Sequence, residues 1–220
     1  MSERINQREA NAMILYLLCA VAAQCIGVKI LQMMMGDVPG YLTSRMMEGI
    51  GLVLLFVFCR FTPFRIYRTG FFASRAEIRR TLIRCGCICI GIILCFVIAR
   101  LVMSHYDERI KSRPWFYPYF SIHMRWLYPF TAVLQEFFAK GVIQENLKRL
   151  FGKEHTTLAI FACALAFSVF HIGYSLYFML GAALLSFVTG FIYEKDRSIW
   201  GCVMIHFCLG FLPRAMGLKG

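Results

Sequence analysis

The sequence predicts an all-α protein, a polytopic transmembrane helical bundle of about seven spans, with a range of six to eight. Hydrophobic residues make up 59% of the 220 residues and charged residues only 16%, whereas a soluble domain is about half apolar and about a quarter charged. The apolar residues also gather in runs close to the roughly 20 residues that a helix needs to cross a bilayer. Both observations indicate a chain that lies in lipid.

The apolar runs follow one another with short, polar or basic connections. The first run is too long for the core of a signal peptide, so we expect it to be retained as a span. The chain divides into an N-terminal part, 1–125, with the first spans and a basic cytoplasmic loop, and a core, 126–220; together they form one membrane domain. The predicted spans are 10–35, 46–61, 81–103, 126–147, 158–172, 176–193 and 200–211.

The net charge of +12 lies mainly in the connections between the apolar runs. The connection after the second run carries Arg60, Arg65, Arg68, Arg75, Arg79, Arg80 and Arg84. Basic loops beside apolar spans are typical of the cytoplasmic face of a membrane, where anionic lipids attract them. We therefore expect a multi-pass protein of a cell membrane, a bacterial cytoplasmic membrane, with the lipid bilayer and not nucleic acid as its partner.

The fourth predicted span holds polar side chains in its middle. It contains the stretch PFTAVLQEFFAKGVIQENLKRLFG, in which Gln135, Glu136 and Lys140 lie among apolar residues. An ionisable group at bilayer depth costs about 3 kcal/mol, so it normally faces the bundle interior and marks a functional site. Glu136 and Lys140 are four residues apart on one helix face, so one interpretation is that they only neutralise each other as an ion pair.

Two histidines lie in other predicted spans. His171 ends the segment FSVFH, and His206 lies in GCVMIHFCLG. With Glu136 they supply one carboxylate and two imidazoles, which are enough to hold and activate a water molecule. The same side chains form a two-His, one-carboxylate ligand set for Zn²⁺. Spacing does not choose between the two, so no cofactor is required and zinc is the candidate metal.

The segments QEFFAKG, FSVFH and SIWGCVMIHFCLG, in this order, resemble the motifs of the CPBP intramembrane metalloproteases. This is the CAAX-protease and bacteriocin-processing family, also called Abi. The family pattern is Glu-Glu-x-x-x-Arg-Gly, then Phe-x-x-x-His, then His-x-x-x-Asn. The resemblance covers residues 130–212 and implies a membrane hydrolase that cleaves peptide bonds with a water held by glutamate and histidine. It assigns the second glutamate of the pattern to Glu136, and the two histidines to His171 and His206.

Three positions depart from the family pattern. Gln135 stands in place of the first glutamate, Lys140 in place of the arginine, and Gly210 in place of the asparagine. Lys140 keeps the charge but loses the planar fork of donors. Gly210 removes an amide whose loss typically costs about 10²–10³ in rate. A carboxamide cannot accept a proton near neutral pH, so with Gln135 the base is Glu136 or a histidine, or the protein has no base.

The resemblance and the departures lead to two functional hypotheses. The first is an intramembrane endopeptidase in which Glu136 and the two histidines activate a water that Gln135 helps to orient. Its substrate would be a peptide or a membrane protein. The second is a catalytically degenerate member that binds a membrane partner, in bacteriocin immunity or in regulation. A channel or carrier is a third class, disfavoured because the chain has no evident inverted repeats.

A few charged residues lie outside this proposed set. Glu48 and Arg100 are placed near the ends of predicted spans, where long side chains can reach the membrane interface. Glu145 lies toward the basic connection after the fourth span, and we expect it at the surface. The sequence therefore assigns none of these three residues to the site.

Overall fold

The computed structural model describes residues 5–38, 40–66, 69–116 and 127–218, and in these ranges the regular structure is helical. The N-terminal part holds α1 (Gln7–Met35), α2 (Gly40–Phe61), α3 (Arg75–Tyr106) and the short α4 (Glu108–Lys111). The remaining elements are α5 (Tyr128–Glu136), the π-helix η2 (Phe137–Gln144), α6 (Glu145–Phe151), the 3-10 helix η3 (Lys153–His155), α7 (Thr156–Val169), α8 (Leu176–Asp196) and α9 (Trp200–Ala215). The all-α prediction is confirmed.

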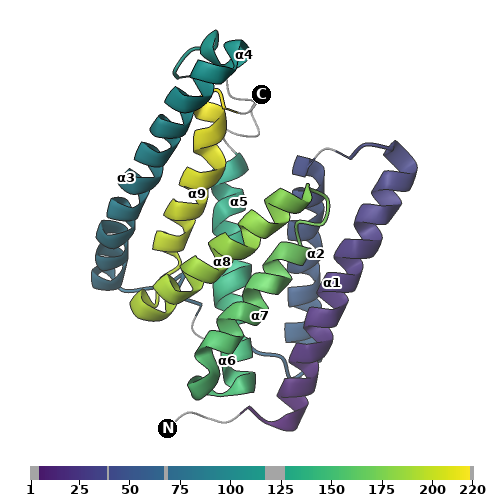
Figure 1. The fold of residues 1–220 in the computed structure, drawn as a ribbon. Helices are drawn as coiled ribbons and strands as arrows, with labels where there is room; N and C mark the ends of the chain where they lie inside the picture. The colour runs from purple at the N-terminus through teal and green to yellow at the C-terminus, as the bar shows by residue number, and fades with distance from the viewer. Residues whose placement is uncertain (1–4, 39, 67–68, 117–126, 219–220) are drawn as a thin grey trace.

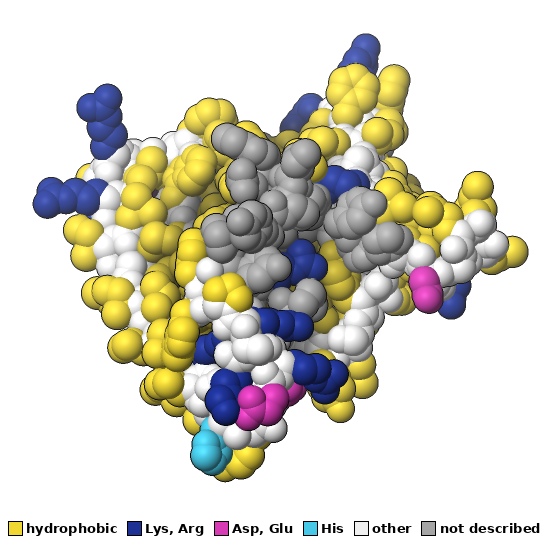
Figure 2. Space-filling model, turned by 90° about the horizontal axis from the view of Figure 1, so that it is seen from above, with side chains coloured by type: hydrophobic (Ala, Val, Ile, Leu, Met, Phe, Trp, Pro, Cys, Tyr) yellow, Lys and Arg dark blue, Asp and Glu magenta, His cyan; other side chains and the backbone are white. Residues whose placement is uncertain are grey.

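Four helices in the described ranges are long and apolar enough to cross a membrane: α1, residues 42–61 of α2, α3 and α8. Their outward faces carry large apolar side chains that are mostly exposed, such as Leu18, Phe56, Ile98 and Leu184. Figure 2 shows hydrophobic side chains over the flanks of the molecule, with Lys and Arg gathered in a few places. Apolar surface of this extent suits lipid, and the chain is a multi-pass membrane protein.

Not every predicted span is a long helix. With 14 and 16 residues, α7 and α9 are shorter than the roughly 20 residues that a span needs. The fourth predicted span corresponds to the continuous run α5–η2–α6. Its first residue, Trp126, and the predicted boundary between 125 and 126 lie outside the described residues.

The run α5–η2–α6 lies in the middle of the bundle (Figure 1). On one side, α5 packs against α9, which in turn packs along α3. On the other side, α5 packs against α2, and α2 pairs with α1. The pair α7 and α8 covers η2. The central run therefore touches both the N-terminal helices and the helices that follow it in the chain.

The main core lies between the first two helices and the central run. Tyr16 stacks on Phe64 with ring centroids 4.8 Å apart and meets Phe58 edge-on at 5.5 Å. Phe138 of η2 and Phe167 of α7 belong to the same buried cluster. Aromatic pairs of this kind stabilise a core by about 0.5–1.5 kcal/mol beyond the area that they bury. This packing fixes η2 and the end of α7, which carry the polar residues described below.

Two charged residues that were expected at the interface or surface are buried. Arg100 is only 1% exposed: its guanidinium donates to the carbonyl oxygens of Arg113, at 2.7 Å, and Gly217, at 3.4 Å, so it ties the end of α3 to the end of the chain. Glu145 is 5% exposed and forms ion pairs with Lys148 at 3.0 Å and Arg197 at 2.6 Å. Both expectations are wrong because internal partners replace the water that these groups would otherwise need.

Candidate functional site

The central run changes its winding directly after Glu136. Residues 137–144 form a π-helix, and the N–H of Glu145 donates to the carbonyl of Lys140, five residues earlier. Segments of π-helix are rare and often lie at functional sites. The wider turn packs closely against the connection before α3, since a Cβ at Gly141 would lie 2.9 Å from the carbonyl oxygen of Thr69. Position 141 therefore needs a glycine, because the backbone of Thr69 lies directly against it.

Gln135 and Glu136 are neighbours in the chain but face different helices. Glu136 is fully buried, and its Oε1 lies 2.8 Å from Nδ1 of His206 on α9. Gln135 instead donates from Nε2 to Oε1 of Glu48 on α2, at 3.4 Å. Adjacent helical residues differ by about 100° in direction, which accounts for the two partners. Glu136 is thus the carboxylate that the structure brings to a histidine.

His171 is held by the end of α7. Its Nδ1 lies 2.7 Å from the carbonyl oxygen of Phe167. A carbonyl oxygen only accepts, so Nδ1 carries the hydrogen and Nε2 keeps its lone pair. In its neutral form, His206 likewise donates from Nδ1 to Oε1 of Glu136 and keeps the lone pair of Nε2. Each histidine therefore has one nitrogen fixed by a partner and the other in an accepting state.

The ring of Phe167 contacts the rings of both histidines. Its centroid lies 4.7 Å from that of His171 and 6.0 Å from that of His206. The second carboxylate oxygen of Glu136, Oε2, is buried and has no hydrogen-bond partner among the described residues. Leaving a buried carboxylate oxygen unpaired costs about 1–3 kcal/mol or more, so this oxygen is suited to receive a water or a substrate group.

The residues predicted as zinc ligands do not fit a zinc site in this arrangement. In the described ranges, no group of three or more His, Cys, Asp or Glu side chains is placed to hold a metal ion. Oε1 of Glu136 and Nδ1 of His206 face each other as hydrogen-bond partners, whereas two ligands of one ion direct their lone pairs at the ion. The arrangement fits a site for water held between a carboxylate and imidazoles.

Lys140 does not pair with Glu136. Its Nζ donates to the carbonyl oxygen of Ser186 on α8 at 2.6 Å and to the hydroxyl of the same residue at 3.0 Å. The ion pairs found within the described residues do not include one between Lys140 and Glu136. The interpretation that the two residues form a direct ion pair is therefore wrong. Lys140 links η2 to α8, and Glu136 keeps its contact with His206.

Glu48 is the neighbour of the site that the sequence did not reveal. It is 5% exposed, pairs with Arg45 at 2.6 Å and accepts the hydrogen bond from Gln135. The expectation that Glu48 reaches the interface is wrong because α2 begins at Gly40 and not at residue 46, which places Glu48 well inside the helix. An Arg and a Glu three residues apart at the start of an apolar run were the available signal.

The position of Gly210 is occupied by another side chain. A Cβ on Gly210 would overlap the hydroxyl oxygen of Tyr128 and lie 3.0 Å from its ring carbon Cε1. The Tyr128 hydroxyl lies 3.5 Å from the backbone oxygen of His206, and the two rings are 6.3 Å apart. Tyr128, at the start of α5, therefore fills the notch that the glycine leaves in α9.

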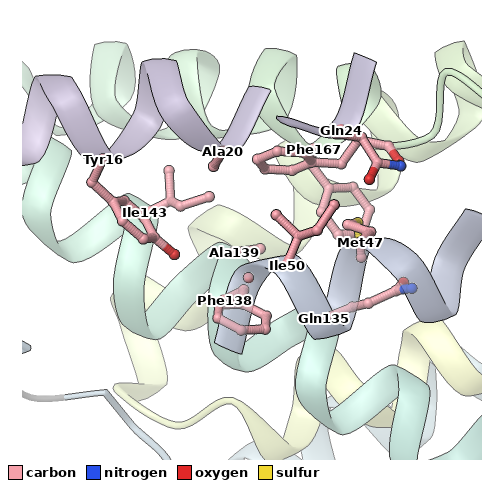
Figure 3. A pocket seen from close by; sticks show the side chains of 12 residues that line it. Tyr16, Ala20, Gln24, Met47, Ile50, Gln135, Phe138, Ala139, Ile143 and Phe167 are labelled. Carbon is pink, nitrogen blue, oxygen red and sulfur yellow. The ribbon is translucent and has the colours of Figure 1, made fainter. Parts of the chain in front are cut away.

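An apolar cavity borders the site on the side of α1 and α2 (Figure 3). It leaves about 30 Å³ for the centres of water molecules, which is room for about one or two waters. Oε1 of Gln24, buried in its wall, has no partner in the described part of the chain. The lining residues are Tyr16, Ala20, Gln24, Met47, Ile50, Gly51, Gln135, Phe138, Ala139, Ile143, Phe167 and Phe170.

Residues 117–212 match one family model, described as type II CAAX prenyl endopeptidase Rce1-like. The matched stretch contains the central run, α7, α8 and most of α9, with Glu136 and both histidines. This match confirms the resemblance to CAAX-type membrane proteases that the motifs indicated. Neither the curated proteins nor the solved structures contain a match to the chain. Glu48 lies outside the matched stretch.

Proposed function

We propose that the protein is an intramembrane endopeptidase, because residues 117–212 match the family model described as type II CAAX prenyl endopeptidase Rce1-like. It hydrolyses a peptide bond at or in the membrane, in a peptide or a membrane protein. The observation that carries the proposal is the buried contact of 2.8 Å between Glu136 and His206, with His171 and His206 both packed against Phe167. A buried carboxylate and two imidazoles, each with one nitrogen fixed, are the parts of a general acid–base site.

In the proposed reaction, a water molecule attacks the carbonyl carbon of the scissile bond. Glu136 takes the proton from the water through Oε2, the oxygen that its contact with His206 leaves available. His206 orients the carboxylate, and the Nε2 lone pair of His171 accepts a hydrogen bond from the same water. When the carbon–nitrogen bond breaks, Glu136 returns the proton to the leaving amine. Every proton that is moved thus has a named donor and acceptor.

Gln135 has a different part in this proposal. It donates one amide hydrogen to Glu48 and keeps a carbonyl oxygen that can accept a hydrogen bond from water but cannot take up a proton near neutral pH. We therefore assign Gln135 to orienting a water in the cavity that it lines, next to Glu136 in the chain. The contact with Glu48 fixes the amide in one orientation, which an exposed glutamine would not maintain.

The alternative is a catalytically silent member of the same family that binds a membrane partner or peptide, in bacteriocin immunity or in regulation. The observation that favours it is the replacement of the first glutamate of the pattern by Gln135, together with the loss of an amide at Gly210. In this alternative, Glu136 and the histidines serve only to hold the helices together. Their substitution would then reduce binding only as far as it unfolds the protein.

The experiment that tests the proposal is cleavage of a mixed peptide library by the purified protein in detergent, read by mass spectrometry. Wild type is compared with His171→Ala and His206→Ala, and with His155→Ala as a matched control, since His155 is exposed in η3. We expect cleavage by wild type and by the control, and loss of cleavage in the two site variants with unfolding temperatures close to that of wild type. Equal cleavage by all four proteins would refute the assigned histidines.

A silent wild type would favour the alternative function. In that case the double variant Glu48→Gln with Gln135→Glu restores the family's carboxylate without creating two adjacent charges. Cleavage that appears only in this double variant would identify the natural protein as a silent scaffold.

A further inference from the structure

We propose that Tyr128 replaces the asparagine that is missing at Gly210, and that its hydroxyl stabilises the oxyanion formed on the scissile carbonyl. This inference rests on the proposed endopeptidase function and names a further catalytic residue for it. It accounts for how the site can lack the family's amide and still carry a hydrogen-bond donor beside His206.

The first argument is the fit between Tyr128 and Gly210. The two residues are 82 positions apart, yet any side chain on Gly210 would overlap the Tyr128 hydroxyl. A tyrosine at 128 and an asparagine at 210 therefore exclude each other. The glycine is a requirement of the tyrosine, and the polar group in this notch is supplied by α5 instead of α9.

The second argument is the place of the notch. His206 and Gly210 are four residues apart, so they lie on the same face of α9, one turn from each other. A hydroxyl seated at Gly210 consequently lies beside the imidazole that holds Glu136. The ring of Tyr128 is also packed against Phe207, at 5.9 Å, and Pro129 follows it at the first turn of α5, where a proline is preorganised for the helix.

The third argument is the weak hydrogen bond that the Tyr128 hydroxyl makes. Its acceptor, the backbone oxygen of His206, lies 3.5 Å away, beyond the distance of about 2.5–3.0 Å typical of a strong O–H···O bond. The phenol hydrogen can therefore turn to a better acceptor at little cost. An alkoxide oxygen is such an acceptor, because hydrogen bonds to a charged partner are roughly twice as strong as neutral ones.

The chemistry balances without a proton leaving Tyr128. As the water oxygen bonds to the carbonyl carbon, the π electrons of the carbonyl move to its oxygen, and the Tyr128 O–H donates a hydrogen bond to the resulting oxyanion. The proton of the water passes to Glu136. When the oxyanion collapses, the carbonyl re-forms, the amine leaves with the proton from Glu136, and Tyr128 is unchanged. Removal of one such donor typically lowers kcat about 10²–10³-fold.

The test measures kcat and KM on one peptide that wild type cleaves, using Tyr128→Phe, Gly210→Asn and the double variant Tyr128→Ala with Gly210→Asn. Tyr177→Phe is the matched control, since Tyr177 of α8 is 86% exposed. We expect a kcat about 10²–10³-fold lower in Tyr128→Phe, with KM and unfolding temperature nearly unchanged, because the donor acts in the transition state. The double variant, which exchanges the phenol for the amide, has a kcat much higher than that of Tyr128→Phe. Gly210→Asn alone does not reach the kcat of the double variant, because its side chain overlaps the Tyr128 hydroxyl.

A Tyr128→Phe variant with the kcat of wild type would overturn the inference and leave the protease assignment intact. The inference would also be overturned if Tyr128→Phe lost thermal stability but its folded fraction kept the kcat of wild type. If wild type cleaves no peptide, both the proposed function and the inference fail. This outcome differs from a Tyr128→Phe variant with the kcat of wild type, in which only the inference fails.

Discussion

Two polar clusters each include residues of the central helical run, and they differ in how their charged groups are paired. The site around Glu136 has one carboxylate oxygen that is buried without a partner in the described structure. Nine residues further along the run, Glu145 belongs to a second cluster, whose charged groups are all paired. We call it the ion-pair cluster; it consists of Glu145, Lys148, Glu194 and Arg197.

In the ion-pair cluster, each charge has two partners of opposite sign. Lys148 lies 3.0 Å from Glu145 and 2.9 Å from Glu194, while Arg197 lies 2.6 Å and 3.2 Å from the same two carboxylates. Such a network joins α6 to the end of α8 and gives each of its charged groups partners of opposite sign. The contrast teaches that burial of charge does not identify a reactive site. A buried group whose hydrogen-bonding capacity is unused does.

The largest expected effect on stability is in the ion-pair cluster. Lys148→Met removes the ammonium and leaves two like charges, the buried Glu145 and the partly exposed Glu194, with Arg197 as their remaining common partner. Breaking a buried ion pair from one side costs about 3–5 kcal/mol. We expect a marked fall in the thermal unfolding temperature in detergent, with the cleavage rate of the folded fraction unchanged. A normal unfolding temperature would contradict the structural role of the cluster.

An intermediate effect is expected at the contact between Gln135 and Glu48. Gln135→Glu restores the residue of the family pattern but places a second carboxylate beside Glu48, at the position of a 3.4 Å hydrogen bond. Two adjacent carboxylates disfavour their shared ionisation. We expect a loss of stability in the single variant that Glu48→Gln reverses, with a coupling of about 0.5–3 kcal/mol in the double-mutant cycle. Additive effects of the two changes would show that the contact is not formed.

The smallest effect is expected where Lys140 meets α8. Ser186→Ala removes the hydroxyl acceptor at 3.0 Å but leaves the Ser186 carbonyl at 2.6 Å from the ammonium. Because one acceptor remains, the loss should be about 0.5–1.5 kcal/mol, the net value of one hydrogen bond. Unfolding followed by circular dichroism would measure it. A much larger loss would indicate that the hydroxyl, and not the carbonyl, holds the charge.

The residues of the site were predictable where lipid itself restricts the chain. Glu136, His171 and His206 stand out because polar groups in apolar spans are rare and costly, and the structure places Glu136 against His206. The π-helix that begins at Phe137 could not be predicted. The change from α to π winding alters which carbonyl oxygen each N–H group bonds, but it leaves no mark in the pattern of apolar and polar residues. The assumption of regular spacing was therefore least reliable at the site.

Contacts between segments that are distant in the sequence could not be predicted either. Gly210 reads as a simple loss until Tyr128, from the start of α5, is seen to fill its place. Glu48 reads as an interfacial side chain until α2 is seen to begin at Gly40. Tyr128 and Glu48 both lie outside the three motifs. A departure within a motif therefore indicates which position changed but not which side chain took its place.

The most direct test of the central claim is one substitution made at both clusters. Glu136→Gln and Glu145→Gln each remove one buried carboxylate from the same helical run, and both cleavage rate and unfolding temperature are measured. We predict that Glu136→Gln abolishes cleavage and leaves the unfolding temperature close to that of wild type, whereas Glu145→Gln lowers the unfolding temperature and leaves cleavage by the folded fraction intact. Cleavage at the wild-type rate by Glu136→Gln would contradict the assignment of Glu136 as the base.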